Sequence, residues 1–135
     1  MIGLWSSKAG AFLRVLAIGT LLVFGLPMLL WPLRWAAVFG WDIPAEADLA
    51  IYFGRCLASA VCVLGFMAFR AAARPAVQPF YFDIMLALIT LMIAVHAYGA
   101  LLGIQPISET IEIAYWILLI VLTLLFYPRE RTRSG

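Results

Sequence analysis

Long stretches without charge constrain the fold of this chain more than any other feature. Residues 15–33 lie uncharged between two arginines, and residues 84–108 lie uncharged between Asp83 and Glu109. Each stretch matches the about 20 apolar residues that a helix needs to cross the hydrocarbon core of a bilayer. Because 66% of the residues are hydrophobic and only 12% are charged, the chain is expected to be a membrane protein.

Two further segments have the same character. Residues 49–69 contain one charge, Arg55, and residues 113–128 contain none after a helix start that holds Glu109 and Glu112. The apolar runs are continuous rather than alternating, which argues against a transmembrane β-barrel. The sequence therefore predicts one all-α membrane domain, residues 1–135. Its expected transmembrane helices cover about 10–31, 48–71, 79–103 and 108–127, and their short connections predict an antiparallel four-helix bundle.

The basic residues predict how this bundle is oriented. Four helices place both termini on one side, and seven of the nine Lys and Arg residues fall there: Lys8, Arg14, Arg70, Arg74, Arg129, Arg131 and Arg133. Cytoplasmic loops carry an excess of Lys and Arg, so both termini are expected in the cytoplasm and the protein in the inner (plasma) membrane. The basic C-terminal tail is expected to set topology and contact anionic lipid rather than bind nucleic acid.

The rare polar residues fall into stripes, because residues three, four and seven apart share a helix face. Asp48, Tyr52 and Arg55 share a face of the second helix, and Glu112 and Tyr115 share a face of the fourth to within about 60°. On the third helix, His96 lies on a face with Gly99 and Gly103. A G-x-x-x-G pair is typical of close helix packing, so His96 is expected to point into the bundle or into an oligomer contact.

Three ionisable residues are also predicted to share a depth in the membrane. With a rise of about 1.5 Å per residue, Arg55, His96 and Glu112 fall within one layer about 5 Å thick below the outer surface. Ionisable groups persist in hydrocarbon when they pair, which predicts an Arg55–Glu112 ion pair with His96 beside it. Tyr52, Tyr115 and Asp48 are expected to complete this polar cluster. The cluster serves either to lock the helices in register or to bind a ligand, and the sequence leaves both interpretations open.

No complete catalytic or metal-binding constellation accompanies these residues. Acid–base chemistry by His96 and Glu112 would need a partner nucleophile, metal set or phosphate-binding loop, and none is visible. A single histidine without a second His, or a Cys three or four residues away, is a poor metal site, so no metal is predicted. No cofactor is predicted either, and axial ligation of a haem or chlorin by His96 would be the exception.

Other polar and aromatic residues have a structural interpretation. Ser108 and Glu109 are suited to cap the fourth helix and its positive dipole end. Trp31, Trp35 and Trp41 lie where an aromatic belt is expected, and Pro27 is expected to kink the first helix.

The order of these features resembles small four-helix membrane proteins of the DoxX-like kind, including the DUF4345 group. The resemblance rests on LLWPLRW at residues 29–35, on a G-W-x-x-P segment at residues 40–44 and on AIYFGRCLA at residues 50–58. It implies a single four-helix bundle and assigns no catalytic residue.

These observations favour a non-catalytic membrane protein that acts through contacts, as an accessory or assembly subunit or as a homo-oligomer. Four features motivate this interpretation: the small size, the near absence of loops, the G-x-x-x-G face and the lack of a complete catalytic constellation. The alternative is a site in the outer half of the bundle for an amphiphilic small molecule such as a quinone, isoprenoid or lipid. A lipid-modifying enzyme at the same site ranks last.

Overall fold

The structure is a computed structural model that describes residues 2–128. Helices are the regular secondary structure of this part of the chain. Four of them are long and apolar enough to cross a membrane: Ser6–Leu30, Asp48–Ala72, Pro75–Leu102 and Ile107–Phe126. Their ends lie within about one helical turn of those predicted, so the four apolar helices are confirmed. Arg129, Arg131 and Arg133 of the predicted cytoplasmic tail lie outside the described residues.

The first span is not one regular helix. It consists of α1 (Ala9–Thr20), a π-helical turn at Leu21–Gly25 and α2 (Leu26–Leu30), and the chain then bends at Trp31 into the short α3 (Pro32–Val38). A π-helical turn inserts an extra residue into the helix ladder and commonly accompanies a bend.

Pro27 explains where this irregularity falls. Proline has no backbone N–H, so the carbonyl four residues before it, that of Val23, loses its helical donor. The indole Nε1 of Trp35 on α3 donates to that carbonyl at 2.8 Å. The bend expected at Pro27 is therefore present as a π turn and a break at Trp31, and Trp35 ties α3 back onto the helix that the proline disrupts.

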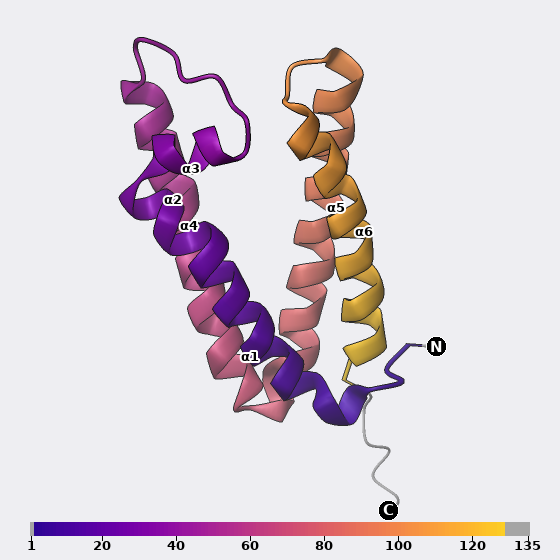
Figure 1. The fold of residues 1–135 in the computed structure, drawn as a ribbon. Coiled ribbons are helices and arrows are strands. Elements are labelled where there is room, and N and C mark those ends of the chain that lie inside the picture. The colour runs from indigo at the N-terminus through magenta and orange to yellow at the C-terminus, as the bar shows by residue number, and fades with distance from the viewer. Residues whose placement is uncertain (1, 129–135) are drawn as a thin grey trace, which may run out of the picture.

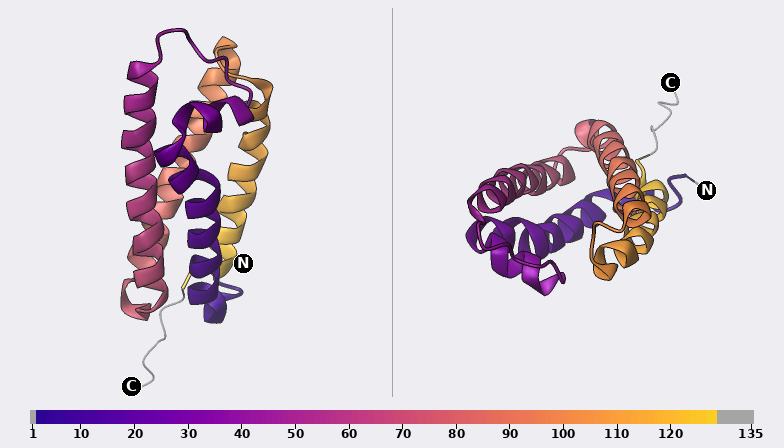
Figure 2. Two further views of the ribbon diagram at one scale, coloured as in Figure 1. Left: turned by 60° about the vertical axis from the view of Figure 1, so that its left-hand side comes forward. Right: turned by 90° about the horizontal axis from the view of Figure 1, so that it is seen from above.

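The helices form two antiparallel hairpins rather than one closed bundle. In the first hairpin, α4 (Asp48–Ala72) packs along α1 and α2. In the second hairpin, α5 (Gln78–Leu102) packs along α6 (Ile107–Phe126). Figure 1 shows the two pairs meeting at one end of the molecule and diverging toward the other, and Figure 2 shows them from above as separate pairs. We call the end where the pairs meet the termini end, and the end where they diverge the loop end.

The hairpins are joined at the termini end. The backbone N–H groups of Gly3 and Trp5 donate to the carbonyls of Leu124 and Leu125 at 2.8 and 2.9 Å, so both ends of the described chain lie together. A hydrophobic core shared by α1, α4, α5 and α6 lies at the same end: Ala9, Leu13, Ala71, Ala72, Phe82, Met85, Ile89 and Leu119.

Small residues bring the first hairpin together. The buried face of α4 includes Ala58, Gly65 and Ala68, and a Cβ atom at Gly65 would lie only 2.8 Å from the Cγ of Leu21 in the π turn. Small side chains allow helices to approach closely in a membrane. The π turn therefore sits against α4 at a position where a side chain on residue 65 would displace that of Leu21.

The G-x-x-x-G prediction for Gly99 and Gly103 is wrong within this chain. Gly103 has φ of +64°, in the left-handed region that glycine adopts most easily, and it ends α5. A Cβ atom at Gly99 would collide with the side chain of Gln105 in the loop that follows, not with another helix. Both glycines shape the turn between α5 and α6.

Candidate functional site

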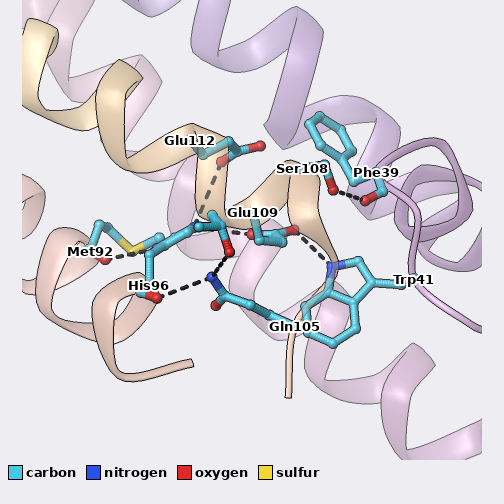
Figure 3. Close-up of polar contacts among 9 residues, drawn as sticks. Phe39, Trp41, Met92, His96, Gln105, Ser108, Glu109 and Glu112 are labelled. Atoms are coloured by element: carbon cyan, nitrogen blue, oxygen red, sulfur yellow. Dashed lines mark hydrogen bonds and ion pairs between the residues drawn. The ribbon is translucent and has the colours of Figure 1, made fainter. Parts of the chain in front are cut away.

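The only histidine lies beside two glutamates near the loop end. His96 comes from the last two turns of α5, and Glu109 and Glu112 come from the first two turns of α6. The Nε2 atom of His96 lies 3.0 Å from Oε2 of Glu109 and 3.7 Å from Oε2 of Glu112 (Figure 3). Only 5% of His96 is exposed. We call these three residues the His–Glu cluster.

The hydrogen bonds of His96 fix where its ring nitrogens point. Nδ1 lies 2.7 Å from the carbonyl oxygen of Met92, which can only accept, so Nδ1 carries a hydrogen. Nε2 then either donates to the Glu109 carboxylate as part of an imidazolium or accepts from a protonated Glu109. In both forms one proton lies between Nε2 and Oε2.

The segment that follows α3 in the first hairpin contacts the cluster and its helix. Trp41, which follows α3, donates from its indole Nε1 to Oε1 of Glu109 at 2.7 Å, and the Ser108 hydroxyl donates to the carbonyl of Phe39 (Figure 3). These bonds join residues that are nearly 70 positions apart in the chain. The loop end, where the hairpins diverge, is therefore bridged at the His–Glu cluster.

Gln105 holds the turn on which the glutamates begin. Its side-chain amide donates to the His96 carbonyl at 3.0 Å and lies 3.1 Å from the Thr110 hydroxyl. Because this amide contacts both helices, it fixes the register of α6 against α5, and with it the distance between the imidazole and the carboxylates.

A cavity of about 480 Å³ lies between the two hairpins, and the His–Glu cluster lines it. Its wall is largely apolar and draws on all four spans. The lining residues include Leu16, Ala17, Phe24 and Met28 from the first span, Leu57, Ala60 and Leu64 from α4, Leu88, Ile89 and Met92 from α5, and Tyr115, Trp116 and Leu119 from α6. The cavity thus combines a long apolar wall with one strongly polar end, as amphiphile-binding sites do.

The exposure of the lining residues shows where the cavity is accessible. Leu57 on α4 and Leu88 on α5 both line it, yet 58% and 41% of these residues are exposed. α4 and α5 are the neighbouring helices of the two hairpins, and above their junction they diverge (Figure 1). The cavity is therefore reached from the side, between α4 and α5, where apolar side chains would face lipid.

The polar end of the cavity carries no basic side chain. None of the described lining residues is a lysine or an arginine, while two are glutamates. In addition, the buried Nε1 of Trp116 has no hydrogen-bond partner within residues 2–128. The described site therefore holds two glutamates without a basic side chain, and one buried donor, the Nε1 of Trp116, without an acceptor.

The predicted Arg55–Glu112 ion pair is wrong. Arg55 is exposed and forms no ion pair within residues 2–128, and with Asp48 and Tyr52 it lines a separate hollow of about 350 Å³ on α4. His96 and Glu112 lie together as expected, and Tyr115 lines the cavity beside them. Of the six residues proposed for the polar cluster, the structure brings together His96, Glu112 and Tyr115.

Glu109 and Trp41 belong to the site and were assigned other roles from the sequence. Glu109 was interpreted as a helix-capping charge and Trp41 as an interfacial anchor. The spacing of Glu109 and Glu112, three residues apart on one helix face, is the signal that indicates a shared site. No comparable signal links Trp41 to Glu109, since their contact depends on the path of the loop after α3.

Comparisons of the chain with protein-family models, curated proteins and solved structures find no match. The DoxX-like resemblance therefore stays a prediction from the sequence.

Proposed function

We propose that this chain is a membrane-embedded binding protein for an amphiphilic small molecule. In this proposal the apolar body of the ligand occupies the cavity between the hairpins, and its polar head group reaches His96, Glu109 and Glu112. The observation that carries the proposal is the cavity itself, which has a nearly continuous apolar wall ending on a group of ionisable side chains. Such a site is expensive to maintain in a membrane unless a ligand uses it.

Three features support the proposal over a purely structural role for the polar residues. A volume of about 480 Å³ lies within the range typical of small-molecule sites. The exposed lining residues Leu57 and Leu88 provide a route from the bilayer, where amphiphiles accumulate. The Arg55–Glu112 pair, which would have locked the helices together, is absent from the described residues.

The expectation of a protein that acts through contacts loses one of its motivations, the G-x-x-x-G face, because Gly99 is covered by Gln105 of the same chain. Association with other chains stays a prediction that no described contact tests.

We also infer that the protein resides in the inner (plasma) membrane with both termini in the cytoplasm. At the termini end the described chain carries Lys8, Arg14, Arg70 and Arg74, and toward the loop end it carries only Arg34 and Arg55. An excess of basic residues on the cytoplasmic side supports this orientation.

A cavity-filling substitution tests the binding function. Ala60 lines the cavity, so Ala60→Phe should occupy part of it without touching the His–Glu cluster. Ala94→Phe makes the same change at an exposed position of α5 outside the lining and serves as the matched control. Each variant is purified in mild detergent, and the bound small molecules are extracted and identified by mass spectrometry.

We expect one defined amphiphile to co-purify with the wild type and with Ala94→Phe. Ala60→Phe should retain about tenfold less of it, since overpacking of a fitted site costs about 1–3 kcal/mol. A profile of bulk membrane lipid that is the same for all three proteins would contradict the proposed function.

A further inference from the structure

The geometry of the His–Glu cluster points to a binding site for a divalent transition-metal ion, with zinc as the reference ion. Nε2 of His96 and the Oε2 atoms of Glu109 and Glu112 each offer a ligand atom, and such atoms of the three residues lie within 4.8 Å of one another. Tetrahedral zinc with bonds of about 2.0–2.2 Å holds its ligand atoms about 3.3–3.6 Å apart. The observed separations from Nε2, 3.0 and 3.7 Å, lie on either side of that value.

Two of the three ligands are already held by outer partners in the way metal ligands usually are. A ligating histidine almost always donates its other ring N–H to a carbonyl or carboxylate, and here Nδ1 of His96 donates to the carbonyl of Met92 at 2.7 Å. Oε1 of Glu109 accepts from Trp41 at 2.7 Å. These bonds leave Nε2 and Oε2 as the atoms that face each other and Glu112.

Charge gives an independent reason for a cation. The cluster brings two carboxylates together in a wall of apolar side chains, and no lysine or arginine among the described residues lines the cavity. Carboxylates in such surroundings need a proton or a cation beside them. The imidazole nitrogen selects against Mg²⁺ and Ca²⁺, which prefer oxygen ligands, and in favour of ions such as zinc, iron, nickel or copper.

Three protein ligands leave a fourth position for a tetrahedral ion. All three cluster residues line the cavity, so this position would face the cavity. Metal sites of this kind bind water or a ligand oxygen at the open position. The proposal thus replaces the expectation of no metal, which looked for a second ligand three or four residues from His96. The turn between α5 and α6 supplies Glu109 and Glu112 from another helix instead.

A zinc titration of the purified protein tests the site. The chain is purified with a tag that contains no histidine, stripped with a chelator and titrated with Zn²⁺ by calorimetry. Co²⁺ is added in parallel, because its visible spectrum reports coordination by nitrogen and oxygen. We expect one ion per chain, and binding should weaken at lower pH because histidine and carboxylate groups must be deprotonated to ligate a metal.

Isosteric variants assign the ligands. Glu109→Gln and Glu112→Gln remove one carboxylate each and should weaken binding by at least about tenfold, since loss of even an outer partner costs about 10–100-fold. Asp48→Asn makes the same change of charge on α4, outside the cluster, and should bind zinc as the wild type does. His96→Ala is a further variant, and the two glutamine variants carry the test if it fails to fold.

Absence of zinc binding by a folded wild-type chain would overturn the proposal. Equal binding by Glu112→Gln and Asp48→Asn would overturn it as well. The titration needs no amphiphile, and Ala60→Phe should bind zinc normally even where it loses the amphiphile. A failure of the metal site and a failure of the proposed binding function are therefore distinguishable.

Discussion

Trp41 links the two hairpins through one hydrogen bond to Glu109. Trp41→Phe removes the indole N–H and keeps an aromatic ring in place. We expect the free energy of unfolding to fall by about 1 kcal/mol, because intramolecular hydrogen bonds and polar contacts in membranes both give modest net contributions. Reversible unfolding in mixed detergent micelles, followed by circular dichroism, measures the change.

Trp31→Phe is the control for this residue. Trp31 is 56% exposed, and its indole makes no hydrogen bond within residues 2–128. Replacing Trp31 with phenylalanine should leave the unfolding free energy of the protein nearly unchanged. Equal effects of the two substitutions would mean that the Trp41–Glu109 bond contributes nothing.

Arg55 shows why single residues could not all be placed from the sequence. Helical spacing correctly groups Asp48, Tyr52 and Arg55 on one face, but it does not say whether that face turns inward. The small residues of α4 decide the question, since Ala58 and Gly65 are buried and Gly65 lies against Leu21 of the π turn, so the first span covers that side of the helix. Arg55 is consequently exposed, and its long side chain can extend along the helix toward water.

At the scale of elements, one hydrogen-bond donor replaces another in the irregular first span. Trp35 supplies to the Val23 carbonyl the hydrogen bond that Pro27 cannot. Trp35→Phe should therefore cost about 1–2 kcal/mol of unfolding free energy, because the exposed Val23 carbonyl would face lipid, where no water replaces the lost donor. In a Pro27→Ala background the same change should cost about 1 kcal/mol less, because residue 27 regains its N–H and the two sites are coupled.

A double-mutant cycle measured by denaturant unfolding gives this coupling directly. Pro32→Ala provides a background in which a proline is removed without restoring a donor to Val23. Strictly additive costs in the Pro27→Ala background would contradict the exchange of donors between the proline and Trp35.

The elements themselves were predictable because their signals are local. Uncharged runs set the length of each helix, and Asp48 begins α4 as expected. The π turn was not predictable in detail, since Pro27 indicates that a bend occurs but not that Trp35 will satisfy the Val23 carbonyl. Gly103 was predicted to pack against a helix, whereas its positive φ makes it the end of α5. A glycine motif alone does not distinguish these two uses.

At the scale of the whole molecule, the inferred orientation makes opposite predictions for the two ends. Single cysteines at Ala45, in the loop before α4, and at Ala76, in the turn before α5, are introduced after Cys56 and Cys62 are replaced by serine. Ala45→Cys should react with a membrane-impermeant thiol reagent in intact cells, because the inferred orientation places the loop end outside. Ala76→Cys should react only after the membrane is permeabilised, since the same orientation places the end with more basic residues inside.

The reverse pattern of labelling would place the termini outside. Labelling of both positions after permeabilisation confirms that each cysteine is accessible in the folded protein. Ala45 and Ala76 are both exposed, which makes them a matched pair for this comparison.

The arrangement of the hairpins lay beyond the sequence for a physical reason. Short loops predict that neighbouring helices run antiparallel, and they do. They do not set the angle between the pairs, which depends on the shared core around Leu13 and Phe82 at one end and on the Trp41–Glu109 bond at the other. The meeting of His96 with Glu109 depends on the turn held by Gln105, whose register no helical periodicity encodes.

The lateral access between Leu57 and Leu88 changes what the solvent is for any molecule that enters the cavity. In the proposed function such a molecule arrives from the bilayer, so its mole fraction among the lipids sets the occupancy, and partitioning can raise that fraction far above its concentration in water. A compound that is scarce in the cytoplasm but abundant in the membrane would saturate a site of modest intrinsic affinity. The lipid composition of the host membrane then acts as the competitor, and it alone decides how selective the cavity has to be.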